Sequence, residues 1–172
     1  MKKIQTHLIG GIIQTNDAEA HTLYSKSTFG EPSEDKIRYS LPEALFLFEK
    51  GKIEILEKTK KLTKQELINK LQRIDKKINT KYSVFKDLRE KGYVVKTALK
   101  FGAEFRVYEK GTRPGKKHAK WIVFTDNESK KLTWHEFSSK NRIAHSTKKK
   151  LLLAIVDEEN SITYYEVSWI KP

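Results

Sequence analysis

The chain has no cysteine, one methionine and four prolines among its 172 residues. Without cysteine it forms no disulfide, and zinc sites or nucleophiles that need a thiolate are excluded. The five histidines show no metal-ligand spacing such as His-Glu-x-x-His, so neither a metal nor another cofactor is expected. No apolar run is long enough to span a bilayer, and the N-terminus lacks the apolar core of a signal peptide. These absences predict a soluble cytoplasmic protein with no membrane partner.

Positive charge, in contrast, is abundant. Lys and Arg number 35 against 22 Asp and Glu, which gives a formal net charge of +13. A surplus of this size predicts a polyanionic partner, with nucleic acid ahead of an acidic membrane surface. The length allows one large domain or two small ones, each with a buried core.

Residues 1–80 are predicted to form a small N-terminal domain of mixed strands and helices. Strands are expected where apolar residues cluster or alternate, at residues 4–13 with a break at Gly10-Gly11, and at residues 22–24, 37–39 and 52–57. Helices are expected after two capping boxes, in which a Ser or Thr stands three residues before a Glu: Ser40 with Glu43, and Thr63 with Glu66. The first helix is apolar nearly all round and should be buried.

Residues 81–172 follow a simpler pattern that predicts a second domain. A helix over about residues 80–91 precedes strands at residues 93–95, 105–108 and 121–124. A third capping box, Thr133 with Glu136, opens another helix, and strands at residues 151–156 and 162–170 follow it. The predicted fold class is therefore α+β, a small N-terminal mixed α/β domain followed by an α/β C-terminal domain.

A candidate site lies in the stretch from Lys100 to His118. Tyr108 ends one strand, and His118 leads into the next across a loop that contains two Gly and one Pro. In such a hairpin both side chains can reach the same face, and strands fix the geometry of a loop site. On spacing alone, a half-buried Tyr that only packs and a surface His explain the pair as well.

Three separated motifs in the second half carry a family resemblance. They are Phe101-Gly102 with Phe105–Tyr108 and His118, then Arg142-Ile143-Ala144-His145-Ser146, and Lys148–Leu153. Together they resemble the archaeal-type tRNA-splicing endonucleases, over about residues 83–170 and more loosely over the N-terminal domain. The resemblance implies a catalytic Tyr, His and Lys at Tyr108, His118 and Lys149. Within the triple Lys, Lys149 is preferred because the family Lys follows a basic residue and stands one residue before the apolar strand; Lys148 and Lys150 stay open.

The family cleaves RNA without a metal, by attack of a ribose 2′-OH on the neighbouring phosphate, which leaves 2′,3′-cyclic phosphate and 5′-OH ends. That reaction needs a base, an acid and a cation that holds the charge on the phosphorane. His118 suits the acid because imidazole titrates near neutrality. Lys149 suits the cation. Tyr108 as base is demanding, because a phenol with pKa of about 10 is mostly protonated at pH 7, and a nearby ammonium would favour the phenolate.

The resemblance also implies an Arg and a Trp that grip a bulged base. Arg142 matches the motif Arg, and Trp169 is the candidate Trp, with packing of Trp169 in the last strand as the alternative. Stacking and cation–π geometry would explain why Arg and Trp serve this purpose. His135 and His145 are interpreted as structural residues on helix faces.

An acidic turn, Asp157-Glu158-Glu159, separates the last two apolar stretches. In the family an acidic loop at this place docks into a basic groove of another subunit, and the final strands pair tail to tail. The resemblance therefore implies a homotetramer that acts on precursor tRNA with a bulge–helix–bulge fold, because an intron needs two cuts and one chain carries one set of catalytic residues. The alternative is a solvated hairpin tip.

Three other functions are weighed against this one. A non-catalytic subunit of the same enzyme would lack the Tyr, His and Lys, all of which are present. A plain RNA- or DNA-binding module would account for the charge alone. A metal-dependent nuclease needs clustered acidic ligands at a strand end, and residues 157–159 are the one acidic cluster in the sequence.

Overall fold

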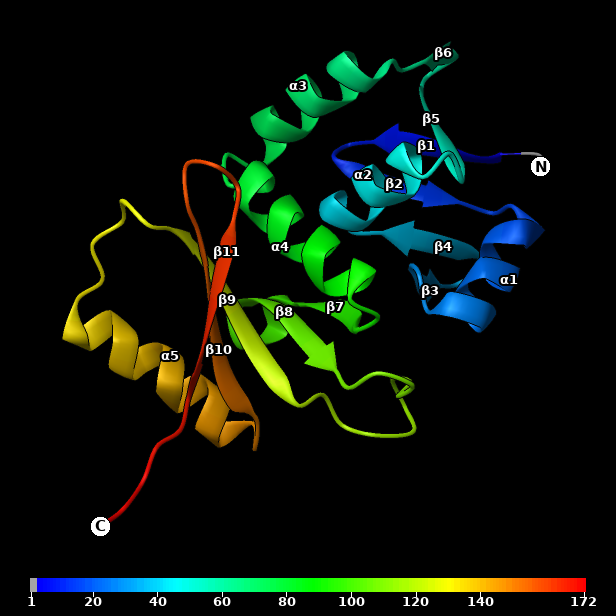
Figure 1. Ribbon diagram of the computed structural model, residues 1–172. Coiled ribbons are helices and arrows are strands. Elements are labelled where there is room, and N and C mark those ends of the chain that lie inside the picture. The colour runs from blue at the N-terminus through cyan, green and yellow to red at the C-terminus, as the bar shows by residue number, and fades with distance from the viewer. Residues whose placement is uncertain (1–2) are drawn as a thin grey trace. The chain divides into compact units, whose positions relative to one another are not determined.

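The structure, a computed structural model, describes residues 3–172. The chain divides into two units, one up to Tyr82 and one from Ser83 onward, and each is described by itself. Both combine helices with a mixed sheet (Figure 1). The predicted α+β class, with a mixed N-terminal domain before an α/β domain, is confirmed.

The first unit is built on a six-stranded sheet of order β3-β4-β2-β1-β5-β6. Its strands are β1 (Ile4–Ile9), β2 (Ile12–Thr15), β3 (Glu31–Ser33), β4 (Lys36–Tyr39), β5 (Ile53–Glu57) and β6 (Lys60–Lys61). β1 pairs parallel with β5, and the other neighbours are antiparallel. The predicted break in the first strand is a tight turn, in which Gly10 and Gly11 both have positive φ (56° and 82°).

Two of the three helices of this unit start where the capping boxes predict. In α2 (Leu41–Glu49) the Glu43 carboxylate accepts from the Ser40 N–H (3.4 Å), and in α3 (Lys64–Ile74) Glu66 accepts from the Thr63 N–H (2.9 Å). α2 packs on β2 and β5, and its residues 42–47 are buried, as expected from its apolar sequence. The core of the unit is formed by Ile13, Ile37, Leu47, Ile53, Ile55, Leu67 and Leu71.

The predicted strand at residues 22–24 is wrong, because these residues lie in helix α1 (Ala18–Ser27). Asp17 caps this helix, since its carboxylate accepts from the Glu19 N–H at 2.9 Å. The cap and the two alanines that follow favour a helix, and they outweigh the strand propensity of Thr22 and Tyr24. Three residues are too few to show a strand period. The short strands β3 and β6 are polar and carried no signal in the sequence.

The second unit has a five-stranded sheet of order β11-β10-β9-β8-β7. Its strands are β7 (Val94–Ala98), β8 (Ala103–Tyr108), β9 (Trp121–Asn127), β10 (Lys150–Val156) and β11 (Ile162–Val167). β9 and β10 are parallel, and the other pairs are antiparallel. The last strand ends at Val167, so the predicted extension to Ile170 is wrong. The polar Ser168 follows, and Trp169 and Ile170 are exposed.

Two helices pack on this sheet. α5 (Trp134–Ser146) lies along β9 and β10, where Ala144 joins Ile122, Phe124 and Leu151 in one apolar cluster (Figure 1). α4 (Ile78–Glu90) begins two residues earlier than predicted, and its Phe85 ring meets Phe105 at 6.0 Å. Phe105 pairs with Val123, on the sheet face opposite to Ile122, so α4 and α5 pack on opposite faces.

Gly30 and Gly51 offer a matched test of packing in the first unit. Both have positive φ (79° and 67°), but a Cβ at Gly30 would lie 2.2 Å from Ile37 Cγ2, whereas among residues 3–172 nothing lies within 4 Å of a Cβ at Gly51. Gly51→Ala should cost about 1 kcal/mol, the strain of the left-handed backbone alone. Gly30→Ala should cost about 2–5 kcal/mol, because overpacking is added. Urea unfolding of both variants measures the difference, and equal losses would contradict the packing at Ile37.

Candidate active site

Tyr108 stands at the end of β8, on the sheet face that α5 covers. Arg106 lies two residues earlier on the same face, because strand side chains alternate, and it pairs across the sheet with Ile122 of the α5 cluster. Tyr108 is buried, at 4% exposure, and Arg106 is half-buried. The strand therefore fixes a phenol and a guanidinium side by side, beyond the C-terminal end of α5.

The loop from Glu109 to Lys120 carries His118. The loop is closed at its base, where the Lys120 N–H donates to Val107 O (2.9 Å) and the Lys120 ammonium pairs with the Glu109 carboxylate (2.7 Å). Gly111 and Gly115 turn the chain with positive φ. Ala119 is buried directly after His118, so the histidine is anchored next to the sheet while its own side chain remains exposed.

The turn that ends α5 places Lys149. The Lys149 N–H donates to Ala144 O (2.9 Å) and the Lys148 N–H to His145 O (3.0 Å), the two hydrogen bonds of a Schellman motif. Lys148 occupies the left-handed position of that motif, with φ of 56°, where glycine is usual. The reversal sends the chain from the helix directly into β10, and Lys149 stands between the two.

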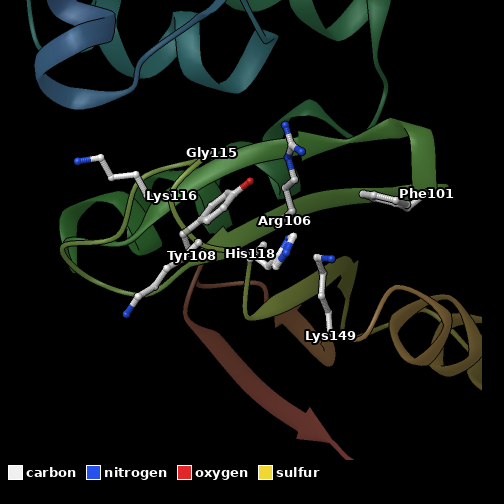
Figure 2. Close-up of a pocket in the computed structure, with 9 residues that line it drawn as sticks. Phe101, Arg106, Tyr108, Gly115, Lys116, His118 and Lys149 are labelled. Atoms are coloured by element: carbon white, nitrogen blue, oxygen red, sulfur yellow. The ribbon is translucent and has the colours of Figure 1, made fainter.

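These three segments bring Tyr108, His118 and Lys149 into one pocket with a volume of about 320 Å³. In the view of Figure 2, the His118 imidazole lies between the Tyr108 ring and the Lys149 ammonium. Phe101 and Arg106 also line the pocket, and the loop contributes Gly115, Lys116, Lys117 and Ala119. A phenol, an imidazole and the ammonium of Lys149 are thus brought together from segments that lie far apart in the sequence, whereas the Lys116 side chain points outward (Figure 2).

The Lys149 ammonium is held by its surroundings. It donates to Thr147 O at 2.9 Å and lies 5.6 Å from the centre of the Phe101 ring, within the range of a cation–π contact. Burial of the ammonium lowers the pKa of Lys149, and the positive charge of Arg106 lowers it further. Two like charges on one small pocket favour an anionic occupant, because an anion between them relieves their repulsion.

The neighbouring lysines are placed differently. Lys150 pairs with the Glu166 carboxylate of β11 at 2.6 Å, and Glu166 also accepts from the Trp121 indole N–H at 2.7 Å. Lys148 is exposed in the Schellman turn. Both line a second, more open hollow together with Lys149, Lys120, His145, Ser146 and Ala119. The assignment of the catalytic role to Lys149 among the three stays a prediction, and Lys149 is the member that lines the pocket with Tyr108 and His118.

Arg142 and Trp169 both lie near His145. Arg142 is exposed on α5, one turn before His145. Trp169 lies beyond the end of β11, is 55% exposed, and meets His145 edge to face with ring centroids 4.2 Å apart. The indole is therefore not packed within the last strand. Its grip on a base together with Arg142 stays a prediction.

In the acidic turn, one carboxylate stabilises the turn itself and the other two are exposed to solvent. Asp157 accepts from the N–H groups of Glu159 (2.9 Å) and Ser161 (2.8 Å), so it forms the turn itself. Asn160 completes the turn with φ of 62°. Glu158 and Glu159 are exposed. If this turn contacts another subunit, as the sequence predicts, these two carboxylates are the ones available for it.

The sequence did not predict that Phe101 and Arg106 line the pocket, and the interpretation of His145 as a structural residue stays a prediction. Arg106 could have been found, because its spacing of two from Tyr108 on a strand puts both on one face. The contact of His145 with Trp169 could not be predicted in this way, since the two residues are 24 positions apart in the sequence.

Within residues 3–172 no group of His, Asp or Glu is arranged to hold a metal ion. In the same range, no helix has the length and apolarity needed to cross a membrane.

The influence of Arg106 on Lys149 can be measured directly. Arg106→Gln removes a positive charge from the pocket that Lys149 also lines, so the pKa of Lys149 should rise, because the protonated form is no longer repelled by it. Arg106→Lys keeps the charge and should leave the pKa low. NMR titration of ¹³C-labelled lysine, with the Lys149 signal assigned by its absence in Lys149→Ala, gives both values. An unchanged pKa in Arg106→Gln would contradict the electrostatic coupling.

Comparison with known proteins assigns both units of the chain to the same family. Residues 78–164 match the family model for the tRNA intron endonuclease, catalytic C-terminal domain, and residues 4–68 match that for the tRNA intron endonuclease, N-terminal domain. The chain is similar to the tRNA-splicing endonuclease of Pyrococcus abyssi (38% identity, 99% of both chains) and to that of Methanothermobacter thermautotrophicus (42%, 89% of both). The tRNA-splicing endonuclease of Nanoarchaeum equitans is 46% identical over 77% of this chain and 88% of its own. The chain therefore belongs to the tRNA intron endonuclease family.

Proposed function

We propose that this protein excises introns from precursor tRNA by cutting the RNA at bulge–helix–bulge sites, with residues 81–172 as the catalytic domain and residues 1–80 as the N-terminal domain. The observation that carries the proposal is that Tyr108, His118 and Lys149 line the same pocket. The relatives that share most of the chain are tRNA-splicing endonucleases by name, which supports the choice of substrate.

The reaction is an internal transfer of the phosphoryl group. The ribose 2′-oxygen at the cut site attacks the adjacent phosphorus, and the bond from phosphorus to the 5′-oxygen of the next nucleotide breaks. The Tyr108 phenolate takes the proton of the 2′-OH and becomes a phenol, and the His118 imidazolium gives a proton to the departing 5′-oxygen and becomes neutral. The products are a 2′,3′-cyclic phosphate and a 5′-OH, and no water is consumed in this step.

Charge in the pocket supports both halves of the reaction. Lys149 neutralises the negative charge that builds on the non-bridging oxygens of the phosphorane. The cations of Lys149 and Arg106 also favour the phenolate form of Tyr108, which is the form that can accept the proton and which becomes a neutral phenol when it does. These protein groups cover the roles of base, acid and electrophile, so we infer that the cut needs no metal ion.

A non-catalytic RNA-binding or structural subunit of the same complex is the alternative function. Such a subunit would keep the fold and the basic surface without a reactive pocket. The buried Tyr108 and the half-buried Lys149 that share a pocket with His118 favour the enzyme.

The function is tested on a bulge–helix–bulge RNA incubated with the protein in excess EDTA. We expect cleavage at both bulges with 2′,3′-cyclic phosphate and 5′-OH ends, because the protein supplies every catalytic group. Electrophoresis before and after treatment with an enzyme that opens cyclic phosphates identifies the ends. Activity that is lost on chelation and restored by Mg²⁺ would exclude the mechanism.

Matched variants separate catalysis from binding in the same assay. His118→Ala should lower the single-turnover rate about 10²- to 10⁴-fold, the usual contribution of a general acid, with RNA binding little changed. Lys149→Ala should lower the rate more than Lys150→Ala, whose ammonium pairs with Glu166. If Lys150→Ala is the slower variant, the assignment of the catalytic lysine is off by one position.

We further infer that the chain works as a homotetramer, a dimer of dimers, since two cuts need two pockets. β11 is an edge strand that pairs with β10 alone among the described strands, so its outer edge is available to a second copy. The exposed Glu158 and Glu159 would dock on a basic surface of another subunit.

The assembly is tested by changing Glu158 and Glu159 to Lys while Asp157 stays. The charge reversal should break the tetramer into dimers and abolish cleavage, with the pocket and the Asp157 turn intact. Light scattering gives the mass. The matched control changes Glu34 and Asp35 to Lys, since these are two adjacent exposed turn carboxylates of the first unit, and it should leave the mass unchanged. A tetramer in the double variant, or a fully active dimer, would show that the turn is only solvated.

A further inference from the structure

Trp134, the first residue of α5, is 83% exposed, more than any other large apolar side chain that the structure describes as exposed. Trp is enriched at binding interfaces, because its ring is apolar over most of its surface and carries one polar N–H. Trp134 is also held in place, because its ring meets the Phe137 ring edge to face at 5.7 Å. The pocket with Tyr108 makes no use of it.

Trp134 shares one face of α5 with Arg142. Residues at a spacing of three or four lie on one helix face, so Trp134, Ser138, Arg142 and His145 form a stripe along the helix, and all four are exposed. With a rise of 1.5 Å per residue, Trp134 lies about 12 Å along the helix from Arg142 and about 16 Å from His145. The stripe runs towards the turn that carries Lys149.

This stripe, defined by Trp134, Ser138, Arg142 and His145, carries no carboxylate. Glu136 is the one acidic residue of α5, and its side chain is bound in the capping box, where it accepts from the Thr133 N–H and hydroxyl, both at 2.9 Å. The other end of the stripe meets Trp169 on His145 and then Lys148, Lys149 and Lys150. An aromatic side chain at each end, one Arg between them and no acid complement an RNA strand better than they complement an acidic or neutral protein surface.

We propose that Trp134 stacks on an unpaired nucleobase of the RNA, at a site about 12 Å along α5 from Arg142, so that α5 guides the strand whose phosphate enters the pocket. The site takes any nucleobase, because stacking uses the ring face that all bases share. This inference rests on the proposed function for the choice of RNA. It adds a binding residue that contributes to affinity and positioning while the chemistry stays with the pocket.

Binding to a bulge–helix–bulge RNA with 2′-deoxy nucleotides at both cut sites, which the proposed reaction cannot cleave, tests the proposal. Trp134→Ala should weaken binding about 5- to 100-fold, the usual worth of one base stack, whereas Trp134→Phe should lose only a part of this. Leu132→Ala removes a nearby exposed apolar side chain outside the stripe and should bind as the wild type does. The slope of log affinity against log salt should be unchanged in Trp134→Ala but about one unit shallower in Arg142→Ala, since only the arginine displaces counterions.

Abasic substitution identifies the stacked base. One abasic position in the RNA should weaken wild-type binding by the same factor as Trp134→Ala and have no further effect in that variant, because both changes remove one contact. Wild-type affinity in Trp134→Ala, or additive losses at every abasic position, would overturn the proposal. So would a change of oligomeric mass in Trp134→Ala, which would make the stripe a contact between copies. If the wild type cleaves the matched all-ribose RNA and these losses are missing, only this inference fails; if it neither binds nor cleaves, the proposed function fails with it.

Discussion

The Schellman turn at the end of α5 is the constraint on which the pocket depends. Ala144, which accepts one of its two hydrogen bonds, is buried in the cluster that joins α5 to β9 and β10. The turn is therefore anchored to the core of the second unit, and the backbone of Lys149, which is part of the turn, is fixed relative to the sheet. The left-handed backbone of Lys148 costs about 1 kcal/mol relative to a right-handed one. Strain of this kind is commonly kept where it fixes a functional side chain.

The pocket is lined by the positive side chains of Arg106 and Lys149, and this charge determines which groups the pocket can stabilise. Burial lowers the pKa of Lys149, and repulsion by the positive charge of Arg106 lowers it further. In the proposed mechanism, an RNA phosphate in the pocket would relieve this repulsion, and the phosphorane, which carries more negative charge, would relieve it further. Interactions that are stronger in the transition state than in the ground state accelerate the reaction. In the proposed mechanism, the strand and the helix cap hold these charges at the pocket before the substrate arrives, so little reorganisation remains at the moment of reaction.

Local signals in the sequence were sufficient for most of the fold. The three capping boxes start α2, α3 and α5 where predicted, because a cap is decided by residues within one turn of each other. The helix at Ala18–Ser27 was missed, because a short apolar triplet has no period and Asp17 was not recognised as a cap. The meeting of Tyr108 and His118 on one pocket follows from a hairpin. The contacts of Phe101, Arg106 and Trp169 depend on how distant segments pack, which one sequence does not reveal.

In the proposed reaction, the ribose of the substrate is the nucleophile, and the side chains of the protein serve as acid, base and cation. The most direct measurement is single-turnover cleavage, in EDTA, of a bulge–helix–bulge RNA that carries one 2′-deoxy nucleotide at a single cut site. We expect this site to be left uncut while the unmodified site in the same molecule is cleaved at its normal rate. Cleavage of both sites at similar rates would contradict it, because water would then be the nucleophile.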